Sequence, residues 1–302
     1  MAVKGIFSYW WFPVISGLVW LGMLLGLLLE WQVNQHGRRY PTQSIHSDIA
    51  YISNVGAGRL QPLFIVGCVL TSIFLDAAFL SERWLRHRGR LVPNTTLMEK
   101  VLSGLSIAFA TVGTVGLICL SIFKTGKYSR LHNTFLALFI GGYLFSAVCI
   151  CWEYQRLGIS ESLHLQPIPT STPTDKPSDY REHRVLRMSF WVKLTFILVE
   201  VALIIAFGVC SLVKRRNAAA VLEWAISFIF TFYAISFVID LYPAVRTKNP
   251  DARYQKSSYM PSALSDSRSP SNGSRSNLDA PANGHHDVEM AQNGNRVPPR
   301  DF

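Results

Sequence analysis

Six separate runs of apolar residues, each close to the length that crosses a membrane, occupy most of the first 241 positions of this chain. The hydrocarbon core of a bilayer is about 30 Å thick, so a helix must contribute about 20 apolar residues to cross it. Each run meets this requirement, and none is long enough to hold two spans. We therefore predict six transmembrane helices, at residues 6–29, 63–80, 101–123, 134–152, 188–213 and 218–241.

The apolar residues are concentrated in these runs, so too few remain elsewhere in the chain to form a separate water-soluble core. The first run is too long for a cleaved signal and begins with a cluster of aromatic residues, so it is predicted to be retained. We predict an all-α, polytopic membrane domain over residues 1–241. Residues 242–302 are rich in Ser, Pro and Asn without apolar periodicity, and they are predicted to form a disordered tail.

The distribution of Lys and Arg predicts the orientation of the spans, because these residues favour cytoplasmic loops. With the amino terminus inside, the inner segments hold 19 of the 29 Lys and Arg residues and the outer loops hold 9. Both termini are therefore predicted to be cytoplasmic. This topology also puts the glycosylation sequons at Asn94 and Asn272 on the cytoplasmic side, so both are predicted to remain unmodified.

The excess of positive charge favours anionic lipid as a partner over nucleic acid, because the basic residues flank the spans and no nucleic-acid-binding motif accompanies them. Near the last span, each basic residue beside an anionic leaflet contributes about 1 kcal/mol of attraction, which predicts a phosphoinositide-binding stretch. Phosphorylation of neighbouring serines would oppose this attraction. Alternatively, the charges only fix the orientation. The residues of this stretch are Arg246, Lys248, Arg253 and Lys256.

All five cysteines lie in or at the predicted spans, so the water-exposed loops contain no disulfide framework and no zinc-like spacing. No metal site or cofactor is predicted. Cys149 and Cys151 lie at the end of the fourth run, where palmitoylation is one interpretation and buried packing is the other.

Ionisable residues inside spans are costly and require either a function or a route to water. Lys193, Glu223 and Asp240 lie near span ends, so we expect their side chains to reach the headgroups. Glu200 lies near the middle of the fifth run among apolar neighbours and is expected to face the bundle interior, and Asp76 lies at intermediate depth. The two acids either form a cation, proton or lipid-headgroup site, or each makes a single interhelical hydrogen bond.

Polar residues in the first two outer loops form a second candidate site. No catalytic signature such as G-x-S-x-G or H-E-x-x-H occurs in the chain. Histidines and a carboxylate that converge at one end of a bundle can nevertheless act as acid and base, although scattered loop residues are more often solvated or structural. Glycines within residues 51–58, Gly56 among them, predict a turn there. The polar residues are His46, Asp48, Ser53, Asn54, His132 and Asn133.

Small residues in three runs predict close approach between helices. They are the pairs Gly22 and Gly26, Gly104 and Ala108, and Gly141 and Gly142.

Several of these segments resemble the FRAG/DRAM/Sfk family over residues 6–241. The similarity is carried by the pattern Trp-Phe-Pro-x-x-Ser-x-x-x-Trp at 11–20, the loop segment Ala-Tyr-Ile-Ser-Asn-Val-Gly-Ala at 50–57, and the 123–132 stretch with the aromatic residues that follow it. The family's loop motif normally has Pro and Asp where this chain has Ala50 and Asn54. Asn54 keeps the hydrogen bonding but lacks the carboxylate.

The resemblance implies a six-helix, non-enzymatic membrane protein similar to the amino-terminal domain of Cwh-type proteins that act on GPI-anchor lipids. The long tail with basic residues looks more like the Sfk branch than the lysosomal, autophagy-linked DRAM branch. The Sfk branch is associated with recruitment of phosphoinositide 4-kinase at the plasma membrane, phospholipid asymmetry and sterol retention. We therefore expect a fungal Sfk-like plasma-membrane protein that organises lipid composition or phosphoinositide signalling.

Three alternatives remain open. The first is a transporter or channel built around Glu200 and Asp76. The second is a GPI-lipid remodelling factor that uses His132 or Asp48, and the third is a DRAM-like protein of the vacuole or lysosome.

Overall fold

The computed structural model of the chain describes residues 8–43, 45–92, 94, 96–164 and 178–248. The chain divides into two units, residues 1–256 and 257–302, and every described residue belongs to the first. All regular elements in the described part are helical, which confirms the predicted all-α class. The predicted disorder of the tail beyond residue 248, its residues Arg253 and Lys256, and the sequon at Asn272 lie outside the described residues.

The second to fifth of the long helices are longer than the apolar runs that predict them, because their polar turns continue beyond the hydrocarbon core. The first begins at Trp11 instead of residue 6, and the last ends at Ser236 instead of residue 241. Six helices are long and apolar enough to cross a membrane, as predicted. The first is followed directly by a π-helical segment, Glu30–Asn34. The last is followed by the short helix Val238–Leu241 and then by a 3₁₀ segment, Tyr242–Lys248, so the part predicted to be disordered begins with a helical turn. The helices are α1 (Trp11–Leu29), α2 (Ile52–Gly56), α3 (Gln61–His87), α4 (Leu97–Ile122), α5 (Ser129–His164), α6 (Ser178–Leu212), α7 (Arg216–Ser236) and α8 (Val238–Leu241).

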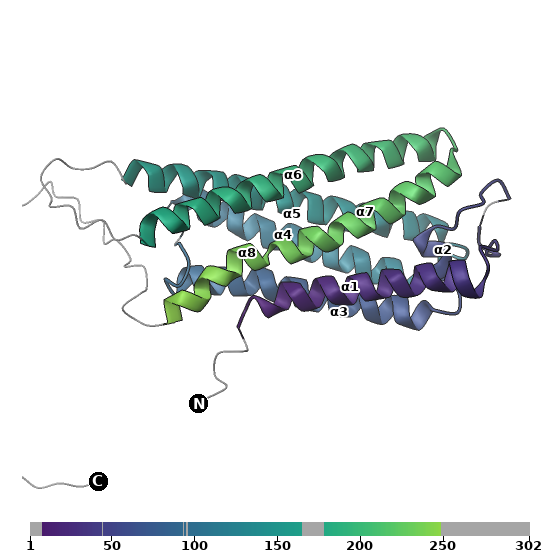
Figure 1. Cartoon of the computed structure of the whole chain (residues 1–302). Coiled ribbons are helices and arrows are strands. Elements are labelled where there is room, and N and C mark those ends of the chain that lie inside the picture. Colours follow the sequence, from purple (N-terminus) through teal and green to yellow (C-terminus); the bar gives the residue numbers. More distant parts are fainter. Residues whose placement is uncertain (1–7, 44, 93, 95, 165–177, 249–302) are drawn as a thin grey trace, which may run out of the picture. The chain divides into compact units, whose positions relative to one another are not determined.

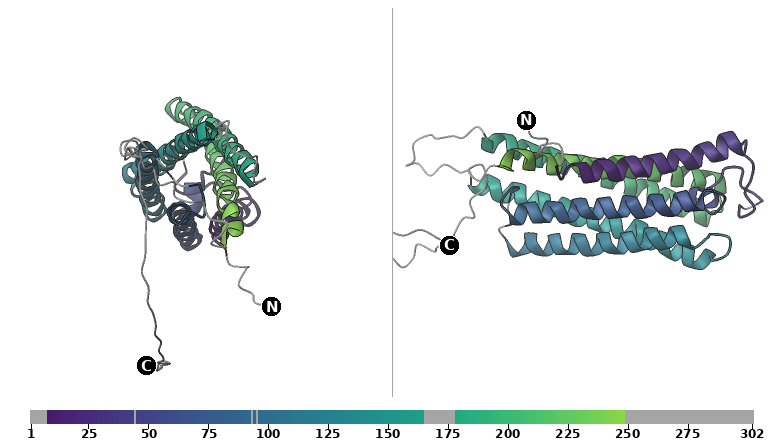
Figure 2. Two further views of the ribbon diagram at one scale, coloured as in Figure 1. Left: turned by 90° about the vertical axis from the view of Figure 1, so that its left-hand side faces the viewer. Right: turned by 90° about the horizontal axis from the view of Figure 1, so that it is seen from below.

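The six long helices form a ring in which each packs against two others. The extensive contacts run from α1 to α3, α3 to α4, α4 to α5, α5 to α6, α6 to α7, and α7 back to α1. The end-on view in Figure 2 shows this arrangement, with α6 on the outside of the bundle. α6 and α7 are antiparallel neighbours, as the short connection between the fifth and sixth runs predicts (Figure 1).

The described connections gather at two ends of the bundle. The end that carries residues 35–43, 45–60, 123–128 and 213–215 is called the loop end (Figure 1). The opposite end, which carries Ser8, residues 88–92 and residues 242–248, is called the terminal end. Six crossings bring the first and last described residues to the same end, which is the arrangement that the predicted topology requires.

Close backbone packing confirms the prediction at Gly142 and also occurs at Gly113 and Gly116, which the spacing of small residues did not single out. A Cβ on Gly142 of α5 would lie 2.4 Å from the backbone nitrogen of Gly113 in α4, and a Cβ on Gly116 would lie 2.5 Å from the backbone nitrogen of Phe139. By contrast, a Cβ on Gly22, Gly104 or Gly141 would meet no atom within 4 Å. The prediction of close approach was therefore wrong for these three glycines, because spacing alone does not tell which side of a helix faces its neighbour.

Two charged residues near the terminal end are buried, contrary to the prediction that both reach water. Lys193 of α6 and Asp240 of α8 are 1% and 8% exposed and form an ion pair with each other. Ser189 donates to the same carboxylate, and the Lys193 ammonium lies 4.2 Å from the centroid of the Phe237 ring. The apolar sequence around each residue hides this pairing, because the partners are 47 positions apart.

A second buried polar network joins α3, α4 and α5 at the same end. Arg86 and Tyr154 both donate to Glu82 over 2.7 Å. Beside them, Glu153 accepts from Arg83 over 3.3 Å and from Asn94 over 2.8 Å. Because the Asn94 amide is used inside this network, the structure gives a second reason, independent of membrane orientation, to expect no glycan on Asn94.

Candidate functional site

Three neighbouring cavities run from the loop end towards the middle of the spans. The polar cavity lies at the loop end and has a volume of about 290 Å³. The middle cavity has about 40 Å³ and shares Ser53, Leu136, Phe207 and Glu223 with the polar cavity. The apolar cavity has about 60 Å³ and shares Phe139, Ile140, Ile226 and Ser227 with the middle cavity. The three cavities therefore lie next to one another along the bundle.

The polar cavity brings together four of the six polar residues predicted to converge at one end of the bundle. Ser53 and Asn54 come from α2, and His132 and Asn133 come from the first turn of α5. His46 and Asp48 are not part of its wall. The wall contains Thr42, Tyr51, Ser53, Asn54, Thr125, Ser129, His132, Asn133, Leu136, Phe207, Ser211, Arg216 and Glu223.

Two adjacent residues of α7 hold the first long loop in place. Glu223 accepts a hydrogen bond from the backbone N–H of Ile52 over 2.9 Å, and the indole N–H of Trp224 donates to the carbonyl of Ala50 over 2.9 Å. The expectation that Glu223 simply reaches the headgroups was wrong, because its carboxylate satisfies an N–H at the start of α2, where helices have unpaired donors. The sequence signal for this anchor is a lone Glu-Trp pair inside an apolar run.

The loop segment that carries the family resemblance is itself packed against the bundle. Residues 52–56 form the short helix α2 and the turn follows at 57–60, so the predicted turn lies later than the glycines suggest. A Cβ on Gly56 would lie 2.7 Å from the Phe64 ring, which explains why glycine is required here. Asn54 is 5% exposed and donates to Thr42 over 3.0 Å, so its amide supports the loop.

The His132 side chain stabilises the connection between α4 and α5. It is 4% exposed, and its Nδ1 lies 2.8 Å from the carbonyl oxygen of Phe123, the residue directly after α4. Its ring also forms part of the wall of the polar cavity.

Asp48 and His46 lie on the exposed surface of the first loop. The Asp48 carboxylate is paired with Arg39 and accepts from Asn217 over 3.2 Å. Hydrogen bonding from Arg39 lowers the pKa of Asp48 below its usual value, so this carboxyl stays charged at neutral pH. The structure does not place Asp48 and His132 in one catalytic arrangement.

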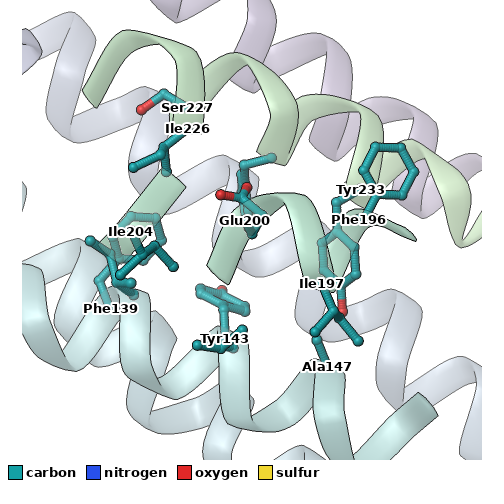
Figure 3. Close-up of a pocket in the computed structure, with 13 residues that line it drawn as sticks. Phe139, Tyr143, Ala147, Phe196, Ile197, Glu200, Ile204, Ile226, Ser227 and Tyr233 are labelled. Carbon is teal, nitrogen blue, oxygen red and sulfur yellow. The ribbon is translucent and has the colours of Figure 1, made fainter. Parts of the chain in front are cut away.

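The apolar cavity lies between α5, α6 and α7, and its only carboxylate belongs to Glu200 (Figure 3). Glu200 continues the inward stripe of α6 that includes Lys193 and Ile197, so it faces the bundle as expected. Its Oε2 atom and the Tyr233 hydroxyl are buried and have no hydrogen-bond partner in the described part. The walls are otherwise aromatic and aliphatic, with Phe139, Tyr143, Ala147, Phe196, Ile204 and Phe230 among them.

Asp76 is connected to this cavity but does not line it. Thr114 donates to the Asp76 carboxylate over 2.9 Å, and the Thr114 oxygen lies 2.8 Å from the hydroxyl of Tyr143. Because the single Thr114 proton goes to Asp76, the Tyr143 hydroxyl is the donor in the second bond. Asp76 therefore lines none of the three cavities, and it makes the interhelical hydrogen bond that was the simpler interpretation.

The fold and the cavities define a class: a polytopic α-helical membrane protein with a polar cavity at one end and apolar cavities within its spans. In the part of the chain that the structure describes, no group of His, Cys, Asp and Glu is arranged to hold a metal ion. The family described as Frag1/DRAM/Sfk1/Cwh43P N-terminal domain matches residues 8–244. The chain belongs to this family, which confirms the resemblance drawn from its sequence.

Two curated relatives are fungal Sfk proteins. The chain is 27% identical over 234 residues to protein sfk1 of Schizosaccharomyces pombe, a match that covers 78% of this chain and 64% of the relative, less than two thirds of its length. It is 24% identical over 290 residues to protein SFK1 of Saccharomyces cerevisiae, covering 82% of this chain and 80% of the relative. No solved structure matches the chain significantly.

Proposed function

We propose that this chain is a non-enzymatic, Sfk-like membrane protein that organises membrane lipid composition or phosphoinositide signalling by binding lipid between its helices. The observation that carries the proposal is the apolar cavity between α5, α6 and α7. Concave apolar sites with few polar groups are typical of small-molecule binding sites. Inside a bilayer, the molecules present at highest concentration are lipids.

The position of α6 supports lipid entry. Few side chains of its span are fully buried in the bundle, and the buried ones among the described side chains are Ser189, Lys193 and Ile197. α6 packs against its ring neighbours α5 and α7 and against α8. A lipid that reaches the apolar cavity therefore has to pass only one peripheral helix.

Cells that lack the protein test this proposal. We expect altered phospholipid distribution between leaflets or altered lipid composition, measured with lipid-specific probes and mass spectrometry. Re-expression of Ala147→Trp, which fills the apolar cavity, is expected to leave the defect. The matched variant Leu198→Trp, at a 62% exposed position of α6, is expected to correct it. Normal lipids in the deletion strain would refute the proposal.

The resemblance also supports a plasma-membrane location with both termini cytoplasmic and a phosphoinositide 4-kinase complex as partner. Removing residues 246–302 from a fluorescently tagged chain tests this part. We expect the shortened protein to remain at the cell surface and kinase recruitment to be lost. Unchanged recruitment would remove the tail from the proposal, and a vacuolar or lysosomal location of the full chain would favour a DRAM-like role.

A transporter remains the second candidate function, because the Tyr143–Thr114–Asp76 hydrogen bonds reach the wall of the cavity that Glu200 lines. Glu200→Gln removes the charge and keeps the shape. Ion or lipid flux in proteoliposomes that falls in this variant would support transport, and absent flux in the unmodified protein would eliminate it.

A further inference from the structure

The cavities change from polar at the loop end to apolar within the spans, just as a phospholipid changes from a polar headgroup to apolar acyl chains. The polar cavity is lined largely by hydroxyl, amide, imidazole and charged groups, whereas aromatic and aliphatic side chains make up most of the walls of the middle and apolar cavities. Because neighbouring cavities share lining residues, they follow one another along the bundle. The wall chemistry therefore suits an amphipathic ligand whose polar part lies at the loop end.

The depth of the cavities agrees with this orientation. Ser129 and Arg216 stand in the first turns of α5 and α7, so the polar cavity lies where these spans begin. Glu200 lies well inside α6, so the apolar cavity lies at the depth of acyl chains. A phospholipid of the leaflet at the loop end would have its headgroup and its chain at these two depths.

The charged groups of the polar cavity favour a phosphate. The Glu223 carboxylate already accepts from the backbone of α2, so its charge is partly satisfied by the protein. The Arg216 guanidinium makes no ion pair or hydrogen bond within the described residues and lies in the wall of the cavity. A guanidinium binds phosphate oxygens in a planar, two-pronged geometry, and hydroxyl donors such as those of Ser129 and Ser211 complete such a site.

The size of the polar cavity argues against a ligand whose only polar group is a hydroxyl. A cavity of about 10–15 Å³ holds one water molecule, and a hydroxyl needs no more space than that. The polar cavity has about 290 Å³, which is far larger. A phosphodiester headgroup uses this space, whereas a sterol or a diacylglycerol would leave most of it to water.

We propose that the three cavities form one binding site for a glycerophospholipid, with its phosphate beside Arg216 and an acyl chain extending past Phe139 into the apolar cavity beside Glu200. The proposal rests on the lipid-binding function above and names the ligand class and its orientation. It needs no covalent step, because binding alone places the lipid.

Photo-crosslinking of the purified full chain tests the site. The chain is held in dodecyl maltoside micelles, which contain no phosphate, with phosphatidylserine that carries a diazirine on one acyl chain. A diacylglycerol probe with the same chain is the comparison. We expect labelled peptides from the parts of α5, α6 and α7 that line the apolar cavity. The phospholipid should label them about tenfold more strongly, because a charge-assisted bond changes affinity by about that factor.

Matched variants separate the two ends of the site. Arg216→Gln is expected to remove the preference for the phospholipid, and Arg215→Gln, the exposed neighbour outside the cavity wall, is expected to keep it. Ala147→Trp should reduce labelling by both probes, and Leu198→Trp should not. Ser227→Met is a milder variant that narrows the apolar and middle cavities if Ala147→Trp does not fold.

Several outcomes would overturn the proposal. Equal labelling by the two probes, an equal loss of preference in Arg215→Gln, or labels confined to the outward face of α6 would each do so. A sterol probe that displaces the phospholipid from the cavity peptides would also contradict it. Excess soluble glycerophosphate that abolishes labelling would show that the polar cavity takes free phosphate esters instead of a lipid headgroup.

The result is distinguishable from failure of the proposed function. Specific labelling without any lipid defect in the deletion strain would refute the function and leave the binding site in place. A lipid defect without labelling of the cavity peptides would refute the site alone.

Discussion

Individual residues in this bundle show how strongly a neighbour on another helix decides a side chain's role. Gly141 and Gly142 are adjacent in sequence, yet only Gly142 lies against the backbone of α4. In the sequence, Lys193 and Asp240 are each an isolated charge near the end of an apolar run. In the structure they form a buried ion pair with each other. Both contrasts lead to paired experiments.

Gly142→Ala is expected to destabilise the bundle, because its new Cβ would lie 2.4 Å from the backbone nitrogen of Gly113 and force α4 and α5 apart. Overpacking of this kind costs about 1–3 kcal/mol. Gly141→Ala is the control, since its Cβ meets nothing within 4 Å. The melting temperatures of both variants are measured in detergent, with size-exclusion chromatography as the readout of the folded fraction. Equal melting temperatures for the two variants would contradict the observed packing.

Asp240→Asn is expected to leave the Lys193 ammonium buried without its counter-charge. Removing one partner of a buried ion pair costs about 3–5 kcal/mol, whereas replacing both by apolar residues is often neutral. The double variant Lys193→Met with Asp240→Leu should therefore recover much of the lost stability. Asp48→Asn, which affects only an exposed pair, should leave the melting temperature unchanged. A double variant that is less stable than the single one would show that the charges do more than neutralise each other.

At the scale of elements, the loop-end structure depends on α7. The loop and α2 receive two of their hydrogen bonds from consecutive residues of this helix, Glu223 and Trp224. Because α7 also lines all three cavities, this anchoring positions the polar cavity next to the middle and apolar cavities.

Trp224→Phe is expected to loosen the loop by removing the indole N–H that donates to Ala50 while keeping an aromatic ring. The expected loss is about 0.5–1.5 kcal/mol, the net contribution of an ordinary hydrogen bond. Hydrogen exchange of the α2 amides should become faster. Trp31→Phe is the matched control, because the buried Trp31 N–H has no partner in the described part and its removal should cost nothing. If both variants accelerate hydrogen exchange in α2 equally, the hydrogen bond from Trp224 to Ala50 does not stabilise α2.

At the scale of the whole molecule, six crossings bring Ser8 and Lys248 to one end of the bundle. The side of the membrane that this end faces is predicted from the Lys and Arg distribution as cytoplasmic. The prediction decides which leaflet the polar cavity faces.

A protease added to intact cells is expected to spare an epitope inserted near Ser265 and to cut one inserted at Ile45, which lies on the loop end and is 80% exposed. Permeabilised cells should lose both epitopes. Cleavage near Ser265 in intact cells would reverse the topology and move the polar cavity to the cytoplasmic leaflet.

The sequence by itself determined the spans, because crossing a bilayer requires a length and an apolar composition that a single run either has or lacks. It also placed Glu200 towards the interior and gathered Ser53, Asn54, His132 and Asn133 at one end, since topology alone brings those segments together. The family followed from motifs within single segments.

Only the tertiary structure decided which polar groups pair and where the cavities lie. Three contacts join residues on different helices: the hydrogen bond from the Ile52 N–H of α2 to Glu223, the Lys193–Asp240 ion pair and the Gly113–Gly142 contact. Their partners depend on how each helix is rotated about its axis, and an apolar run that is hydrophobic on all sides carries little information about that rotation. The cavities are the spaces left when those rotations are fixed, so they belong to the packed bundle and to no single segment.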